Sequence, residues 1–172
     1  TVEKEIRFGP EVLKMSEGKV KEMTEYSASL TGLTGEMEEN PYNLPLSVRK
    51  FVTIASIIAM DTDIIILDEP TAGQDIKGIR LLENMLKELT ARGKTIVTIT
   101  HDMEFVVNNF HKVFVMAHKN LLKITNILSK IGTASAKIGI NKLNIVAALN
   151  APSKAIILNI NPKKLAPESP IN

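Results

Sequence analysis

Two short runs of β-branched residues constrain the fold of this chain more than any other feature. They are IIIL at 64–67 and TIVTIT at 95–100, and both are near-continuous, as in strands that are covered on both faces of a parallel sheet. The segment between them has apolar residues at helical spacing and a stop signal at Gly93. Those apolar residues are Ile79, Leu82, Met85, Leu86 and Leu89. The pattern predicts a β-α-β unit.

The alternation of strands and helices continues to about residue 117. DMEFVVNNF at 102–110 predicts a short helix, and VFVMA at 113–117 predicts a third buried strand. Such alternation indicates an α/β fold with a mostly parallel sheet. Upstream, the segments 16–33 and 48–60 predict two helices, which are separated by a loop rich in Gly, Pro and Asn.

The chain divides into three parts of different composition. We expect a helical subdomain at 1–60, a strand-and-helix core at 61–118 and a basic tail at 119–172. The net charge of +2 hides this contrast, because residues 1–104 hold 18 Asp and Glu against 12 Lys and Arg. Residues 105–172 hold nine Lys and a single Glu.

The basic tail allows three interpretations, of which a solvated C-terminal extension is favoured. A membrane-surface contact is the second, since clustered lysines attract anionic lipid by about 1 kcal/mol each. Nucleic-acid binding is disfavoured because neither Arg nor any aromatic residue accompanies the lysines after Phe114. We therefore expect no nucleic-acid partner. Within the tail, 121–132 favours a helix and 155–160 a strand.

The composition excludes cysteine chemistry and a membrane-spanning segment. The chain has no cysteine, which rules out disulfides, thiolate zinc sites and a cysteine nucleophile within it. No stretch approaches the about 20 consecutive apolar residues of a membrane span. We therefore expect no membrane span in this chain.

Asp68 and Glu69 directly follow the first predicted strand. Ligands of open α/β sheets bind at the carboxyl ends of the strands. One carboxylate there can hold Mg²⁺, and a second can orient or deprotonate an attacking water in phosphoryl transfer. For the Asp-Glu pair alone, an acidic strand end that emerges into solvent is the favoured interpretation.

His101 changes this balance, because it follows the second predicted strand. In a parallel sheet the two strand ends share one edge, so an imidazole there can donate a hydrogen bond to a phosphate beside the two carboxylates. The coincidence of both motifs on one β-α-β unit favours a phosphoryl-transfer site. His111 and His118 are interpreted as loop residues.

With these motifs in order, the chain resembles the nucleotide-binding subunit of ATP-binding cassette (ABC) transporters. ILDEP at 66–70 matches the Walker B strand of that family, TAGQD at 71–75 its D-loop and ITHD at 99–102 its switch loop. TVEKEIRFGPE at 1–11 and ENPYNLPLSVRK at 39–50 look most like the energy-coupling factor and cobalt or nickel importer branch. The resemblance implies a P-loop NTPase, RecA-like core with a helical subdomain, and it covers residues 1 to about 117.

The resemblance also implies a role for each matching residue. Asp68 would hold Mg²⁺ through water, Glu69 would be the general base, His101 would contact the γ-phosphate of ATP, and Asp75 would reach a second ATPase subunit. The implied function is ATP hydrolysis by a dimer that drives uptake of a small solute, such as a metal ion or vitamin, through transmembrane subunits. The implied location is peripheral, on the cytoplasmic face of the cell membrane.

Two departures from the family pattern point to an alternative. No G-x-x-x-x-G-K-[ST] phosphate cradle occurs in the 172 residues, and GTASAKIG at 132–139 lacks its second glycine and its Ser or Thr. We expect the cradle upstream of Thr1, so the chain is interpreted as the downstream part of a longer protein. The signature motif, which meets ATP in that family, falls on LPLSV at 44–48, where Pro45 has no N–H. Ser47 is the candidate ATP-binding residue left there, and it is expected to cap a helix that begins near Arg49 and points its N-terminus at an anion. The alternative is therefore a truncated or degenerate, non-catalytic subunit.

Overall fold

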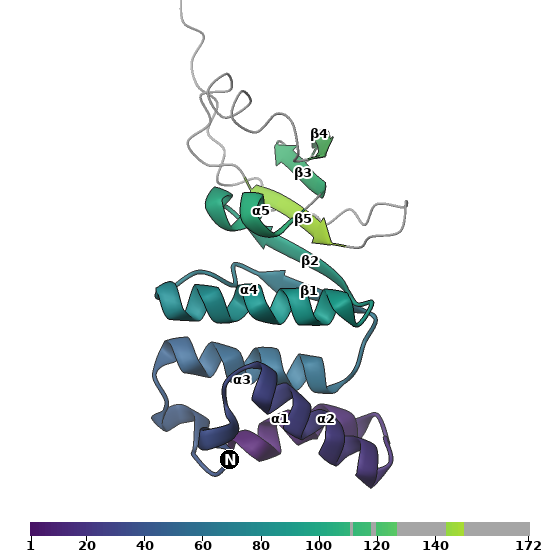
Figure 1. Ribbon diagram of the computed structural model, residues 1–172, viewed down its shortest axis with the longest axis vertical. Helices are drawn as coiled ribbons and strands as arrows, with labels where there is room; N and C mark the ends of the chain where they lie inside the picture. Colours follow the sequence, from purple (N-terminus) through teal and green to yellow (C-terminus); the bar gives the residue numbers. More distant parts are fainter. Residues whose placement is uncertain (111, 118–119, 127–143, 150–172) are drawn as a thin grey trace, which may run out of the picture. The chain divides into compact units, whose positions relative to one another are not determined.

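Helices dominate the first half of the chain and strands the second half (Figure 1). The computed structural model describes residues 1–110, 112–117, 120–126 and 144–149. They form two units, one of Thr1–Ile65 with Thr71–Lys94 and one of Ile66–Pro70 with the residues from Thr95 onward. In chain order the elements are α1 (Val2–Val12), α2 (Glu17–Leu30), the 3₁₀ turns η1 (Thr34–Glu36) and η2 (Pro41–Asn43), α3 (Leu46–Ala59), β1 (Ile64–Asp68), α4 (Ile76–Ala91), β2 (Thr95–Thr100), α5 (Met103–Asn109), β3 (Lys112–Ala117), β4 (Asn120–Asn126) and β5 (Asn144–Leu149).

The helices α1, α2 and α3 of the first unit pack on one another in pairs. Each presents an apolar stripe at three- and four-residue spacing, such as Val20, Met23 and Ala28 on α2. α1 comes close to the end of α3 at Gly9, where an added Cβ would lie 2.6 Å from Cγ of Met60. A side chain at position 9 would therefore displace the Met60 side chain.

The sequence predicted two of these three helices. α2 and α3 lie where 16–33 and 48–60 were expected, although α3 begins two residues earlier. α1 was not predicted, because Gly9 and Pro10 resemble a turn signal. Pro10 is instead buried inside the helix, four residues after Ile6.

α4 confirms the predicted helix between the first two strands. Asp75 is its N-cap, and the Asp75 carboxylate accepts the Gly78 N–H at 2.8 Å. Leu82, Met85, Leu86 and Leu89 are buried, and Ile79 is half-buried. Gly93 follows the helix with φ +83°, the left-handed conformation that a glycine stop supplies.

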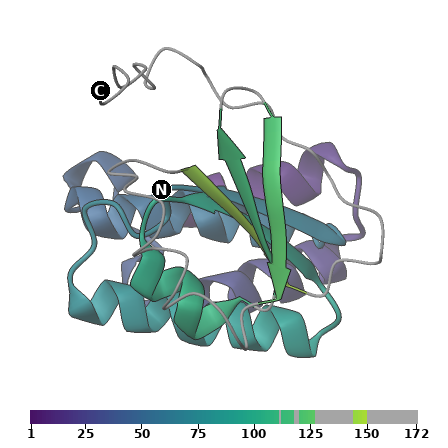
Figure 2. The ribbon, with the colours of Figure 1, turned by 90° about the horizontal axis from the view of Figure 1, so that it is seen from above.

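The strands form one sheet in the order β1-β2-β5-β3-β4. β5 lies between β2 and β3 and runs antiparallel to both, pairing Thr98 and Val113 with Ala147. β2 and β3 therefore run in the same direction, as the α/β pattern predicts. β4 lies beside β3 in an antiparallel pair (Figure 2).

The described strands correct two sequence expectations. Residues 120–126 form β4, so the helix expected over 121–132 is wrong for that part. β4 pairs with β3 from Asn120, which lies opposite Ala117. β1 is not covered on both faces, because Ile64 and Ile66 are 46% and 49% exposed while Ile65 and Leu67 are buried. The residues His111, His118, 132–139 and 155–160 lie outside the described part.

Candidate functional site

The chain makes a tight turn at the carboxyl end of β1. Asp68 is the last residue of the strand and is exposed, and Glu69 follows with φ +46°, which is uncommon for a residue other than glycine. The Glu69 N–H donates to the Ile99 carbonyl of β2 at 2.8 Å, which holds the turn against the neighbouring strand. Backbone strain of this kind clusters at functional sites.

Glu69 and His101, predicted to share one edge of the sheet, are in direct contact. Oε1 of Glu69 lies 2.8 Å from Nδ1 of His101, and the Thr100 hydroxyl donates to Oε2 of Glu69 at 3.3 Å. The Glu69 side chain is 33% exposed and that of His101 69% exposed. Both oxygens of the Glu69 carboxylate thus have a polar partner, and the carboxylate is still accessible to water.

Thr100 is a site residue that the sequence analysis missed. It is fully buried, and its hydroxyl oxygen also accepts the Asp102 N–H at 3.1 Å. Asp102 in turn caps α5 by accepting the Phe105 N–H at 3.0 Å. A hydroxyl residue directly before His101, at the end of an apolar strand, is the sequence signal that could have indicated it.

Asp68 fits one kind of magnesium site. No cluster of three or more His, Asp or Glu side chains that could hold a metal occurs among the described residues. A cage made only of protein ligands is therefore not provided there. A single exposed carboxylate suits Mg²⁺ that keeps several waters and shares phosphate oxygens, as this ion usually does.

Ser47 does not cap a helix, contrary to the sequence expectation. α3 begins at Leu46 with Pro45 as its N-cap, so no side chain caps it and Ser47 lies within the first turn. The first backbone bond of this end joins the Arg49 N–H to the Pro45 carbonyl at 2.9 Å. Proline can take this place because its φ of −53° suits a helix start.

Ser47 and the loop 71–75, which carries Asp75, are linked by side chains. The Lys50 ammonium donates to the Ala72 carbonyl, and the Gln74 amide nitrogen donates to the Ser47 carbonyl at 3.1 Å. No sequence pattern indicated either contact. The loop that carries Asp75 is thus bonded to the first turn of α3, which carries Ser47.

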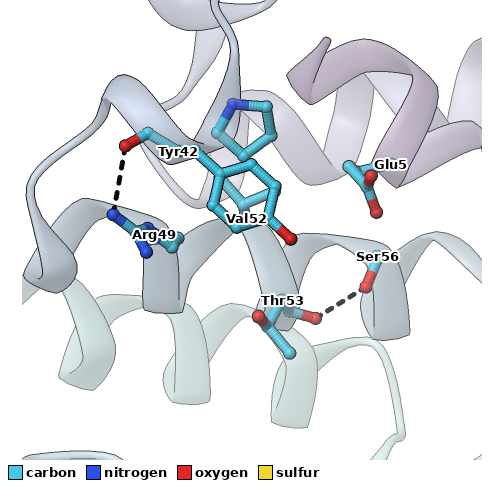
Figure 3. A pocket seen from close by; sticks show the side chains of 7 residues that line it. Glu5, Tyr42, Arg49, Val52, Thr53 and Ser56 are labelled. Carbon is cyan, nitrogen blue, oxygen red and sulfur yellow. Dashed lines mark hydrogen bonds between the residues drawn. The ribbon is translucent and has the colours of Figure 1, made fainter.

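A cavity of about 270 Å³ lies beside α3 in the first unit (Figure 3). Arg49 is on its wall and donates to the carbonyls of Tyr42 and Leu44, both at 3.2 Å. Glu5 faces it from α1 (Figure 3). The Ser56 hydroxyl on the same wall donates to the Thr53 carbonyl at 2.8 Å, so this hydroxyl proton is already engaged.

Comparison with known proteins decides the family. The chain is 37% identical over 124 residues to the energy-coupling factor transporter ATP-binding protein EcfA2 of Mycoplasma pneumoniae, which covers 72% of this chain and 41% of the relative. It is also 37% identical over 123 residues to EcfA1 of Mycoplasmoides gallisepticum, covering 72% and 44%. This chain is a homologue of ABC transporter ATP-binding proteins. It spans less than half the length of these relatives.

Solved structures show the same fold. The structure of CbiO1 from Clostridium perfringens, part of the ABC transporter complex CbiONQ, matches with a TM-score of 0.67 and 28% identity over 74% of this chain and 51% of that one. The fold of this homologue is therefore that of an ABC ATPase domain. No protein-family model matches the chain. Within its described residues, no helix has both the length and the apolar character to cross a membrane.

Proposed function

We propose that this chain is part of the ATP-binding and hydrolysing subunit of an ABC-type importer of the energy-coupling factor kind. The contact between Glu69 and His101 carries the proposal, because it joins a carboxylate and an imidazole where a γ-phosphate and its attacking water would meet. The names of the relatives support the same class. The solute would be small, such as a metal ion or a vitamin.

In this function Glu69 is the general base. Thr100 and His101 fix its two oxygens, and the exposed carboxylate can still accept a proton from water. Because Nδ1 of His101 faces Glu69, Nε2 is the nitrogen left to meet a phosphate oxygen. Mg²⁺ held through water at Asp68 would neutralise phosphate charge.

The partners follow from the same proposal. Ser47 and Asp75 would face ATP and residues of a second ATPase subunit, and transmembrane subunits would carry the solute. The chain would then be peripheral, on the cytoplasmic face of the cell membrane, with no nucleic-acid partner.

A non-catalytic subunit is the second candidate, and the signature segment favours it. Leu46 is 68% exposed where the family pattern has a small residue, and Pro45 supplies neither an N–H nor a hydroxyl. Ser47 does not cap the helix, as described above. The 172 residues also contain no phosphate cradle.

Glu69→Gln separates the two candidates. In an assembly that supplies a phosphate cradle in cis or as a second polypeptide, this change should slow ATP hydrolysis by about 10²–10⁴-fold while ATP binding is largely kept. The amide keeps the size of the side chain but cannot take a proton. Phosphate release and nucleotide titration measure the two effects.

Glu104→Gln is the matched control, since Glu104 is an exposed carboxylate on α5, and it should leave turnover unchanged. A turnover rate that Glu69→Gln does not alter would remove Glu69 as the base. A parent assembly without turnover would favour the non-catalytic candidate.

A further inference from the structure

The loop 71–75 between β1 and α4 is tied down by side chains. Within the loop, the Gln74 N–H donates to the Thr71 carbonyl at 3.1 Å, and Gly73 adopts φ +74°. The Lys50 ammonium of α3 donates to the Ala72 carbonyl, and the Gln74 side chain reaches back to the Ser47 carbonyl. The two contacts run in opposite directions, one from α3 to the loop and one from the loop to α3.

The position of the Gln74 side chain depends on Gly78. A Cβ added at Gly78 would lie 2.3 Å from Oε1 of Gln74, 3.2 Å from its Cδ and 3.3 Å from its Cβ. Gly78 is buried in the first turn of α4, where alanine would be the better helix former. The glycine thus leaves room for Gln74 at the expense of helix propensity.

We propose that Lys50 and Gln74 are positioning residues that lock the loop 71–75 to the first turn of α3. The lock makes Ser47 and Asp75 parts of one rigid platform. Asp75 is held from the other side as well, because its carboxylate caps α4. A displacement of the start of α3 is therefore transmitted to Asp75.

The functional meaning of this lock rests on the proposed function. There, Ser47 and Asp75 both face the second ATPase subunit, and the platform presents them to it with a fixed spacing. The lock itself is a property of the free chain, so it can be measured without nucleotide or partner.

Amide hydrogen exchange of the full chain, read by NMR, tests the lock. The reporters are the Gln74 and Gly78 N–H groups, which are bonded to Thr71 and Asp75. In Lys50→Met both reporters should exchange about fivefold faster, because one intramolecular hydrogen bond is lost. In Gln74→Met the Gly78 reporter should exchange faster by about the same factor, for the same reason. Lys50→Arg keeps a long cationic donor and should restore slow exchange.

Gly78→Ala provides a second and independent perturbation. It should speed exchange at Gln74 by displacing that side chain, while exchange in the middle of α4 becomes slower because alanine favours the helix. Lys87→Met is the matched control, because Lys87 is an exposed lysine on α4, and it should leave both reporters unchanged.

Unchanged reporters in Lys50→Met and Gly78→Ala would overturn the proposal. Equal acceleration of exchange at all amides of α3 and α4 would also overturn it, because this indicates only global destabilisation. A Lys50→Arg variant that exchanges as fast as Lys50→Met would overturn it as well. An assembly of the parent chain that does not hydrolyse ATP would overturn the proposed function and leave this measurement unaffected.

Discussion

Two threonines of β2 differ at the scale of single atoms. Thr98 and Thr100 are both fully buried in the same strand. The Thr100 hydroxyl donates to Glu69 and accepts the Asp102 N–H, whereas the Thr98 hydroxyl has no hydrogen-bond partner among the described residues. A buried hydroxyl stabilises a fold only when it is bonded, so the two residues should respond differently to the same substitution.

Replacing each threonine by valine tests this difference. Thr100→Val removes two hydrogen bonds and should lower the free energy of unfolding by about 1–3 kcal/mol. Thr98→Val removes an unbonded hydroxyl and should be neutral or stabilising. Urea unfolding of the three chains measures both effects. Equal losses in the two variants would contradict the role assigned to the Thr100 hydroxyl.

Residue chemistry predicted that Glu69 and His101 lie together, but not the side chains that support them. Glu69 and His101 could be placed together because parallel strands end at one edge of a sheet. The side-chain contacts of Thr100, Lys50 and Gln74 depend on the tertiary fold, which no local pattern specifies. The expected capping role of Ser47 failed because a proline can itself begin a helix.

Element by element, hydrophobic periodicity predicted the strands and helices of 61–117 and two helices before them. The expected helix over 121–132 was wrong at β4, where LLKIT fits a strand as well as a helix and pairing with β3 decides. β5 was not predicted, since its partners β2 and β3 lie about 30 or more residues upstream in the sequence. Pairing between distant segments is what sequence patterns encode least.

Tyr26 of α2 contacts Arg92, the residue that follows α4, and the Arg92 guanidinium lies 3.8 Å from the centre of the ring. The Tyr26 hydroxyl is buried and has no hydrogen-bond partner in the part of the chain that the structure describes. Burial raises the pKa of Tyr26, and the positive charge of Arg92 opposes part of this effect. The folded chain therefore favours the neutral phenol.

This contact should make stability fall at high pH. Below the ordinary tyrosine pKa of about 10 the phenol is neutral in both states. As the pH rises from there through the raised pKa, the unfolded chain loses the proton more readily, so stability is lost. Tyr26→Phe should show less of this decline in urea unfolding between pH 9 and 11.

The chain has only one other tyrosine, Tyr42, which is 79% exposed. Tyr42→Phe should therefore keep the full decline and serves as the control. A decline of the same size in Tyr26→Phe and the parent chain would remove Tyr26 as its source.

At the scale of the whole molecule, the 172 residues contain the candidate site residues but not the phosphate cradle of this family. The chain spans 41% and 44% of two relatives, and its 172 residues contain no phosphate cradle. In the proposed function, Asp68, Glu69 and His101 of the described site would contact the metal and the γ-phosphate. Catalytic groups without a cradle give little ground-state affinity.

Direct titration of the chain with MgATP tests this consequence. A cradle binds phosphate through several charge-assisted hydrogen bonds of roughly 1.5–3 kcal/mol each, so the absence of three of them weakens binding by at least about a thousandfold. For the chain alone, isothermal titration should give a dissociation constant larger than about 0.1 mM. Asp68→Asn should weaken any residual binding in the presence of Mg²⁺, whereas Glu104→Gln should not. Submicromolar binding by the chain alone would contradict this account, because the phosphates would then be held by a second set of residues.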